Sequence, residues 1–245
     1  MPTLHLAAEP GEIAETILLP GDPLRGERIA RSVLREPACH NTLRNMLGFT
    51  GTWEQGRLSI QATGMGAPST AIYTTELFRH HGIQTAIRVG TCGALQDGIG
   101  LGDLVIAVSA GTDSTVGGRL PAGMNYRPTA PFELVSAAMA SAARHSWTAH
   151  AGSIMSSDTF YGMDLDALAA LTDAGALALD METATLYDVA ARHGVRALSI
   201  LVVTDHLGQG AGIEASARED MFTRTTEVAL DVLRSCPLAP SGRSR

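Results

Sequence analysis

The sequence predicts a single-domain α/β fold with a largely parallel, mixed central sheet flanked by helices. Short, almost continuously apolar runs alternate with longer stretches of helical periodicity along the chain. This pattern is typical of strands that helices cover on both faces. No linker or internal repeat interrupts the alternation, so we expect one domain at residues 1–236. The Pro-, Ser- and Arg-rich residues 237–245 are expected to form a frayed tail.

The first half of the chain supplies the early elements of that fold. The run 17–19 enters a Pro-Gly-Asp-Pro turn, which predicts a strand and then a helix with Pro23 in its first turn. Two later runs separated by Glu-Gln-Gly predict a β-hairpin. The expected strands are 17–19, 51–53, 58–63, 85–89 and 103–108, and the expected helices are 24–34 and 69–81.

The second half repeats the alternation after a long loop. Residues 117–131 are rich in Gly and Pro, so we expect an irregular insertion there. Gly194 predicts the end of a helix, because glycine is common just past a helix terminus. The expected strands are 149–154, 176–179 and 197–203, and the expected helices are 132–144, 182–192 and 213–233.

Composition and charge argue against several classes of function. The net charge of the 245-residue chain is -7, which disfavours nucleic acid as a partner because phosphate contacts need clustered Lys and Arg. Cys39, Cys92 and Cys236 show no metal-ligand spacing and are expected to be reduced thiols in a cytoplasmic protein. We expect no signal peptide and no membrane contact, because acidic residues interrupt the amino-terminal region and no apolar run approaches about 18 residues.

Two strand ends predict a site for an anion. The turn at Gly21 exposes backbone N–H groups before a helix N-terminus, and Arg25 lies one turn into that helix. Alone, this pattern is more often an ordinary turn with a surface arginine. Arg88 lies within an apolar strand, where an unpaired charge is costly, so a negative group must face it. That group is either a bound anion near Gly90 and Thr91 or a carboxylate in a structural ion pair.

Two other strand ends carry carboxylates. Asp180 and Glu182 flank Met181, and such carboxylates accept hydrogen bonds from sugar hydroxyls while methionine packs on a sugar face. The alternative is a helix N-terminus that favours acids through its dipole. Asp205 follows Thr204 at the end of another apolar strand, where a carboxyl group is suited to donate a proton. The alternative there is an aspartate that caps the next turn.

Around these residues the chain resembles the bacterial hexameric purine nucleoside phosphorylases, within the wider nucleoside phosphorylase family. The resemblance extends from about residue 3 to 233, and residues 117–131 match poorly. The resemblance is specific because so many of the family's motifs occur in the same order along this chain. The motifs that carry it are LLPGDPLRGERIA, RNMLGFTGTW, GMGAPSTAIYTTEL, IRVGTCGAL, GTDS, DMETATLYDVAARHG and VVTDH.

The resemblance implies a complete active site. It implies a proton donor, Asp205, assisted by Arg218. Its implied phosphate site consists of Gly21, Arg25, Arg88, Val89, Gly90 and Thr91, with Arg44 from a neighbouring subunit. Its implied nucleoside site consists of Met65, Phe160, Tyr161, Asp180, Met181, Glu182 and Thr204, with His5 from that neighbour.

The implied reaction is cleavage of a purine nucleoside by phosphate. Inorganic phosphate is a co-substrate, no metal or organic cofactor is implied, and the subunits are expected to assemble as a trimer of dimers. The family usually has Glu at the position of Asp180, which is one methylene shorter, and Ser at Thr91 and Thr204, which keep the hydroxyl.

Three alternatives remain to be weighed against this reading. A uridine phosphorylase would present a Gln/Arg pair to the base, and none is found in the sequence. A nucleosidase, which uses water, would not need the phosphate-site arginines. A non-catalytic nucleoside-binding protein would be favoured by loss of Asp205 or Glu182, and both are present.

Overall fold

The structure is a computed structural model that describes residues 2–54, 56–116, 127–208, 210–213 and 218–238. Most of the expected insertion and most of the expected tail lie outside these residues. The elements are β1 (Thr16–Pro20), α1 (Pro23–Val33), β2 (Arg35–Asn41), β3 (Gly48–Trp53), β4 (Gly56–Gln61), α2 (Gly66–His80), β5 (Thr85–Ala94), β6 (Leu104–Thr112), α3 (Phe132–Arg144), β7 (Ala149–Ser156), α4 (Leu165–Asp173), β8 (Ala178–Asp180), α5 (Thr183–His193), β9 (Arg196–His206), β10 (Ala211–Gly212) and α6 (Arg218–Ser235).

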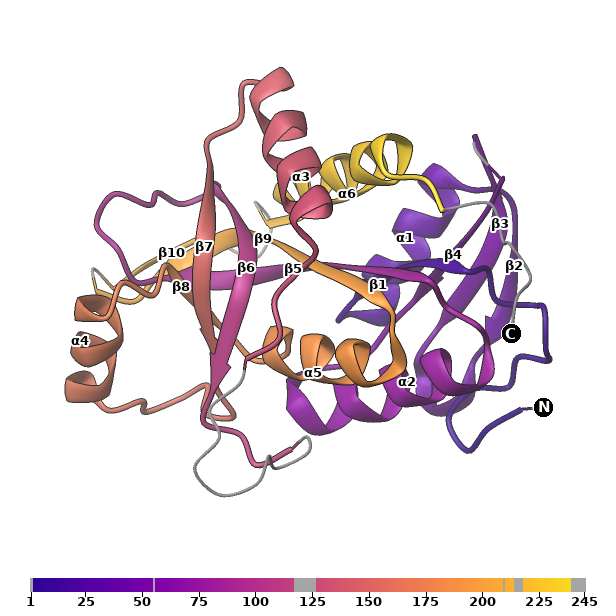
Figure 1. The fold of residues 1–245 in the computed structure, drawn as a ribbon, viewed down its shortest axis with the longest axis horizontal. Coiled ribbons are helices and arrows are strands. Elements are labelled where there is room, and N and C mark those ends of the chain that lie inside the picture. Colours follow the sequence, from indigo (N-terminus) through magenta and orange to yellow (C-terminus); the bar gives the residue numbers. More distant parts are fainter. Residues whose placement is uncertain (1, 55, 117–126, 209, 214–217, 239–245) are drawn as a thin grey trace.

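The strands of the described part form one mixed sheet in the order β10-β9-β6-β7-β8-β5-β1-β4-β3-β2. β1, β5 and β9 run parallel to one another, whereas β6 runs antiparallel to β9 and β8 antiparallel to β5. Helices α1, α3 and α6 cover one face, and α2 and α5 cover the other (Figure 1). The predicted α/β class and mixed sheet are therefore confirmed.

The sheet also closes on itself, which the sequence did not predict. β9 pairs with β5 as well as with β6, so β5, β9, β6, β7 and β8 form a closed ring. The pairing of β5 with β9 shifts between Cys92 and Gly93, and such a bulge bends a strand. A side chain at Gly93 would not fit, because its Cβ would lie 2.9 Å from Cγ of Leu207. The bend turns the end of β5 toward β8.

Several elements differ from the sequence prediction. β2, an edge strand with mostly polar residues, and α4, which buries none of its residues, were not expected from the sequence. β10 is only two residues long. The last helix begins at Arg218 rather than at residue 213. Ile213 donates its N–H to the carbonyl of Thr204 over 2.9 Å, so the chain there still runs beside β9.

The central strands hold the site in place because their side chains are buried on both faces. Ile17, Leu18, Ile87, Leu198 and Ile200 are all completely buried. Burial of each such side chain contributes about 1.5–3 kcal/mol relative to exposure. No helix in the described part of the chain is both long and apolar enough to cross a membrane.

Asp231 of α6 should make the fold sensitive to acid. Its carboxylate accepts hydrogen bonds from Ser141, Arg144 and His145 at the end of α3, and from Arg234. Partial burial alone would raise the pKa of Asp231, but these hydrogen bonds outweigh it and lower that pKa to about 2. A carboxyl group with a lowered pKa in the folded state stabilises the fold above its unfolded pKa of about 4, and this contribution disappears as pH falls toward 2.

We therefore expect Asp231→Asn to destabilise the protein at pH 7 and to converge on the wild type as pH falls. Urea unfolding at pH 7, 4 and 3, at one protein concentration, would measure the difference in the free energy of unfolding. A difference that stays constant across this range would show that the charge of Asp231 does not contribute.

Candidate active site

A cavity of about 820 Å³ lies where β1, β5, β8 and β9 end and the chain turns into the following segments. Ligand sites in α/β sheets commonly form at such strand ends. The lining includes twelve residues that the sequence analysis selected: Gly21, Arg25, Met65, Arg88, Gly90, Thr91, Phe160, Asp180, Met181, Glu182, Thr204 and Asp205.

The turn between β1 and α1 forms one wall of this cavity. The side chain of Asp22 caps α1 by accepting the N–H of Arg25 over 2.6 Å, and Pro23 occupies the first turn. The guanidinium carbon of Arg25 lies 3.3 Å from the ring centroid of Phe222 in α6. The N-terminus of α1 and the Arg25 cation thus lie at the same wall, where both attract anions.

Arg88 is buried between the cavity and two carboxylates. Its guanidinium donates to Glu182, and its Nε lies 3.5 Å from Oδ2 of Asp180. A Cβ at Gly90 would lie only 2.9 Å from one guanidinium nitrogen, so the glycine makes room for the arginine. The sequence left open whether Arg88 meets a bound anion or a carboxylate. The structure shows that two carboxylates partner it while it also lines the cavity.

The carboxylate of Asp180 is held mainly by groups of the protein, although Asp180 also belongs to the lining of the cavity. Its side chain has no exposed surface, and it accepts hydrogen bonds from the hydroxyls of Ser156 and Thr183 and from the Thr183 N–H. Burial raises the pKa of Asp180, although the adjacent Arg88 cation opposes this rise. The shorter side chain therefore holds Arg88 from behind and caps the start of α5.

Glu182 lies closer to the cavity and connects three elements. One of its carboxylate oxygens accepts the N–H of Gly66 at the start of α2 over 2.7 Å, and the other accepts from Arg88. Its side chain is only 7% exposed. Met65, just before Gly66, is 83% exposed, and Met181 is half-buried. This wall combines a carboxylate with flexible apolar side chains, which is the chemistry a sugar face requires.

Asp205 lies at the end of β9 and points into space that a glycine leaves open. It accepts the hydroxyl of Thr204 over 2.8 Å. A Cβ at Gly212 would lie 2.8 Å from its Oδ1, so any larger residue there would displace the carboxylate. The carboxyl group therefore has a defined position in the lining of the cavity, where it can exchange a proton with a bound molecule.

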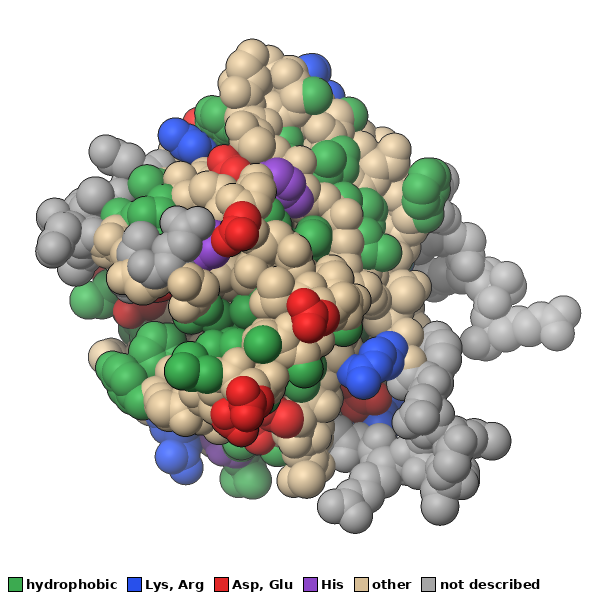
Figure 2. Space-filling view, turned by 90° about the vertical axis from the view of Figure 1, so that its left-hand side faces the viewer, with side chains coloured by type: hydrophobic (Ala, Val, Ile, Leu, Met, Phe, Trp, Pro, Cys, Tyr) green, Lys and Arg blue, Asp and Glu red, His purple; other side chains and the backbone are tan. Residues whose placement is uncertain are grey.

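Two aromatic residues lie at the mouth of the cavity, but only one lines it. Phe160 is in the lining, whereas Tyr161 packs edge-on against it at 4.8 Å between ring centroids and is 88% exposed. The end of the molecule that carries α4 shows apolar side chains gathered in a recess (Figure 2). An exposed aromatic beside a cavity offers a flat apolar surface to a planar ligand.

Residues 15–236 match the Phosphorylase superfamily. The chain belongs to this superfamily. It is 45% identical over 229 residues to a protein of Clostridium perfringens (strain SM101 / Type A) named purine nucleoside phosphorylase DeoD-type, and the match covers 94% of this chain and 97% of that protein. Proteins of the same name from Bacillus cereus (strain B4264) and Bacillus mycoides (strain KBAB4) are each 43% identical over the same shares.

Four of the selected residues that the structure describes, Val89, His5, Arg44 and Tyr161, are not in the lining of the cavity of this superfamily member. The side chain of Val89 belongs to the core. Arg218 begins α6, and its side chain lies outside the described part of the chain. Tyr161 lies beside the lining residue Phe160, whereas His5 and Arg44 lie elsewhere on the surface.

The segments that carry His5 and Arg44 lie close to each other although 39 positions separate the two residues, because Asn41 hydrogen-bonds to both Ala7 and Met46. The His5 ring contacts Tyr73 at 6.0 Å between centroids, and Nδ1 of His5 lies 2.6 Å from Glu76. Burial raises the pKa of Tyr73, and the charge of Arg44 opposes this rise, so Arg44 lies within electrostatic range of Tyr73. Exposed apolar side chains neighbour both residues along the chain. We call this region the His5–Arg44 surface; it includes Leu4, His5, Leu43, Arg44 and Ile72.

Other residues of the site were not expected from the sequence. Met46, Ser69 and Leu207 line the cavity, and Ser156 and Thr183 hold Asp180. Ser69 lies inside a motif that carried the resemblance, so its position there was the available signal. Ser156 ends a strand, as the selected residues do. Thr183 also lies inside such a motif, DMETATLYDVAARHG, but its role depends on a contact with Asp180 that only the structure reveals.

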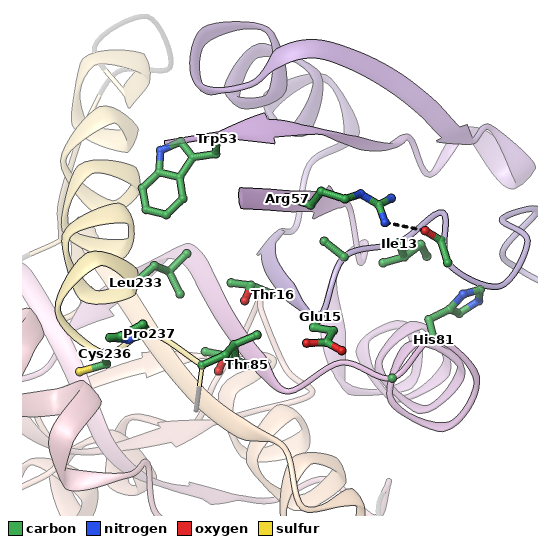
Figure 3. Close-up of a pocket in the computed structure, with 14 residues that line it drawn as sticks. Ile13, Glu15, Thr16, Trp53, Arg57, His81, Thr85, Leu233, Cys236 and Pro237 are labelled. Atoms are coloured by element: carbon green, nitrogen blue, oxygen red, sulfur yellow. Dashed lines mark hydrogen bonds between the residues drawn. The ribbon is translucent and has the colours of Figure 1, made fainter. Parts of the chain in front are cut away.

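A second cavity, of about 610 Å³, lies at the opposite ends of the central strands (Figure 3). Thr16 and Thr85, which begin β1 and β5, line it. Among its described lining residues the one Lys or Arg is Arg57, whose guanidinium donates to the carbonyls of Gly11 and Glu12 at 2.7 Å each. None of the described site residues selected from the sequence is in the lining of this second cavity.

Proposed function

We propose that this chain is a purine nucleoside phosphorylase, which converts a purine nucleoside and phosphate to a purine base and pentose 1-phosphate. The observation that carries this proposal is the buried Arg88, which lines one cavity together with Arg25, Glu182 and Asp205. The names of the relatives support the same activity. An anion pocket next to a sugar-binding carboxylate and a proton donor is suited to transfer of a glycosyl group.

The proposed mechanism is mainly electrostatic. Arg25, Arg88 and the amides at Gly90 and Thr91 bind phosphate against the sugar. As the bond between C1′ and the base breaks, positive charge develops on the sugar and the phosphate dianion stabilises it. A phosphate oxygen then forms the new bond to C1′. Asp205 gives its proton to N7 of the purine, so the bonding electrons leave on a neutral base.

The substrate requirement can be tested directly on the purified protein. We expect inosine or adenosine to be cleaved only when phosphate is present, with pentose 1-phosphate as the product, and uridine to be cleaved poorly. Cleavage without phosphate would indicate a nucleosidase, and rapid cleavage of uridine a pyrimidine enzyme. Binding of nucleoside without cleavage would indicate a binding protein.

We further propose that the active site is shared between subunits of a homo-oligomer, arranged as a trimer of dimers. His5 and Arg44 do not line the cavity of their own chain, and they lie together on a surface with exposed apolar side chains. Such a patch is suited to bury against a second copy. A two-fold interface would let each subunit give these residues to its partner.

A mixing experiment tests the shared site. Arg44→Ala and Asp205→Ala homo-oligomers should each be nearly inactive. After the two are unfolded and refolded together, half of the dimers are mixed, and each mixed dimer has one intact site of two. Activity should therefore recover to roughly a quarter of the wild-type value.

Differently tagged subunits provide the control for mixing. Mixed dimers are isolated through both tags before assay, so that failure to exchange subunits is recognised. Inactive mixed dimers would show that Arg44 serves its own chain or only the fold, and the shared site would be wrong.

We also propose that the protein works in the cytoplasm. All three cysteines are unpaired in the structure. Free thiols are typical of reducing compartments, where disulfides do not persist.

A further inference from the structure

Asn41, the last residue of β2, hydrogen-bonds to both segments of the His5–Arg44 surface. Its Oδ1 accepts the N–H of Ala7, two residues after His5, over 2.9 Å. Its Nδ2 donates to the carbonyl of Met46, two residues after Arg44, over 2.7 Å. Asn41 is 1% exposed, so its amide is buried, whereas Ala7 and Met46 are partly accessible to water. One buried amide therefore links two segments that are distant in sequence.

The segment around Arg44 needs such support, because its backbone is unusual. Arg44 and Asn45 have φ angles of 54° and 60°, in the left-handed region that residues other than glycine rarely occupy. Backbone in this region persists only where surrounding contacts hold it. Within the turn, the N–H groups of Asn45 and Met46 donate to Thr42 and Leu43, at 3.0 Å each. The Arg44 side chain itself is exposed.

A second buried amide reinforces the contact with Met46. Nε2 of Gln61 donates to the same carbonyl over 3.0 Å, and Oε1 of Gln61 accepts from Nε2 of His40 over 3.2 Å. Burial lowers the pKa of His40 to about 4, so its ring is neutral at pH 7 and its Nδ1 can accept the hydroxyl of Thr50. This chain of bonds fixes which end of the Gln61 amide faces Met46.

The segment around His5 has two anchors of its own. Glu76 of α2 accepts from the His5 N–H over 3.2 Å and contacts its ring nitrogen at 2.6 Å. Asn41 holds the chain two residues later, at Ala7. His5 therefore keeps a direct support in Glu76 when Asn41 is changed, whereas the Arg44 turn depends on the amides of Asn41 and Gln61.

We infer that Asn41 is a positioning residue that sets the Arg44 turn, and through Ala7 the His5 segment, for delivery to a neighbouring subunit's site. This inference rests on the proposed shared site. Asn41 does not line the cavity of its own chain, so it acts on the reaction only through the segments that it holds.

The Asn41→Asp variant separates the two bonds of the amide. One carboxylate oxygen can still accept from Ala7, but the other now faces the Met46 carbonyl with no hydrogen to donate. The Met46 carbonyl thereby loses the hydrogen bond from Asn41 and faces a second oxygen instead. We expect this change to displace the Arg44 turn and to raise the KM for phosphate about tenfold. The KM for nucleoside, to which His5 contributes, should change less than about twofold. Initial rates with each substrate varied in turn measure both constants.

Ser141→Ala is the matched control for general destabilisation. The buried Ser141 hydroxyl donates to the Asp231 carboxylate over 2.6 Å between α3 and α6, away from both segments and from the bonds that support them. Both variants are compared by thermal unfolding and by oligomer mass. We expect Ser141→Ala to lower the unfolding temperature while leaving both KM values near the wild-type values. Equal changes in the phosphate KM of the two variants would overturn the inference.

Mixed oligomers decide whether Asn41 acts across the interface. In a dimer of an Asn41→Asp subunit with an Asp205→Ala subunit, the only site with Asp205 receives an intact Arg44 turn from its partner. Its phosphate KM should return to the wild-type value. A KM that stays raised would show that Asn41 serves its own site, and the inference would be wrong. Arg44→Ala, assayed in parallel, shows separately whether Arg44 binds phosphate at all.

Discussion

Replacing Arg88 with alanine should reduce kcat/KM for phosphate at least about 10²-fold. A hydrogen bond to a charged group contributes about 1.5–3 kcal/mol, and Arg88 is the buried cation in the lining of the cavity. A phosphate titration of activity, together with equilibrium binding of phosphate to the variant, measures the loss. Unchanged phosphate affinity would show that Arg88 serves only its two carboxylates.

The structure also predicts that Arg88→Ala destabilises the fold. Without Arg88, Asp180 and Glu182 remain close together and largely buried, so each charge disfavours the other. Burial already raises the pKa of Asp180 beside the cation, and loss of Arg88 should raise that pKa further. A carboxyl group with a raised pKa in the folded state destabilises the fold as pH rises. Compared with the wild type, the variant should therefore be destabilised more at pH 7 than at pH 4, where Asp180 is largely protonated in both the folded and the unfolded state, while Ser156 and Thr183 still hold the Asp180 carboxyl group.

The sequence predicts those parts of the fold that depend on local periodicity. The helix expected at 132–144 matches the bounds of α3, and the apolar runs correspond to strands whose side chains are buried on both faces. Closure of the sheet could not be predicted in this way. It depends on a one-residue shift near Gly93 and on a short antiparallel contact between β5 and β8. Such a contact leaves almost no pattern in the sequence.

The candidate site shows the same limit. Arg88 is recognisable because a cation inside an apolar strand needs a negative partner. Its partners, Asp180 and Glu182, follow it by about 90 positions and are identified only by the fold. Asp180 looked like a sugar ligand in the sequence, yet its position places it behind Arg88. Whether a carboxylate faces a cavity or a neighbouring side chain depends on one methylene and on the direction of a short strand.

Asn41 and Gln61 could not be recognised from the sequence as residues that support the site. Both bind backbone groups of other segments. Because almost every residue has a backbone carbonyl and N–H, the sequence does not show which of them will be the partner. Nothing in the spacing of residues 41, 46 and 61 distinguishes this arrangement from ordinary polar residues in a hairpin. Residues that position others through backbone contacts are therefore the part of a site that a single sequence reveals least.

Asp205→Asn should slow cleavage of ordinary purine nucleosides about 10²-fold or more, which is the usual contribution of a positioned acid. The carboxamide has nearly the same shape, and its oxygen can still accept the Thr204 hydroxyl that Asp205 accepts over 2.8 Å. It cannot deliver a proton to N7. A nucleoside already alkylated at N7 carries the positive charge before cleavage, so its rate should change little. Rates for both substrates at saturating phosphate measure the effect.

The two variants distinguish binding of phosphate from transfer of the proton. Arg88→Ala should slow the ordinary and the N7-alkylated nucleoside alike, because both need phosphate at C1′. Asp205→Asn should slow only the ordinary one and leave the phosphate KM unchanged, because the cations at Arg25 and Arg88 remain. Thr204→Val provides a matched control that removes the adjacent hydroxyl and keeps the carboxyl group. If Asp205→Asn slows both substrates equally, Asp205 positions the substrate, and the proton comes from another group.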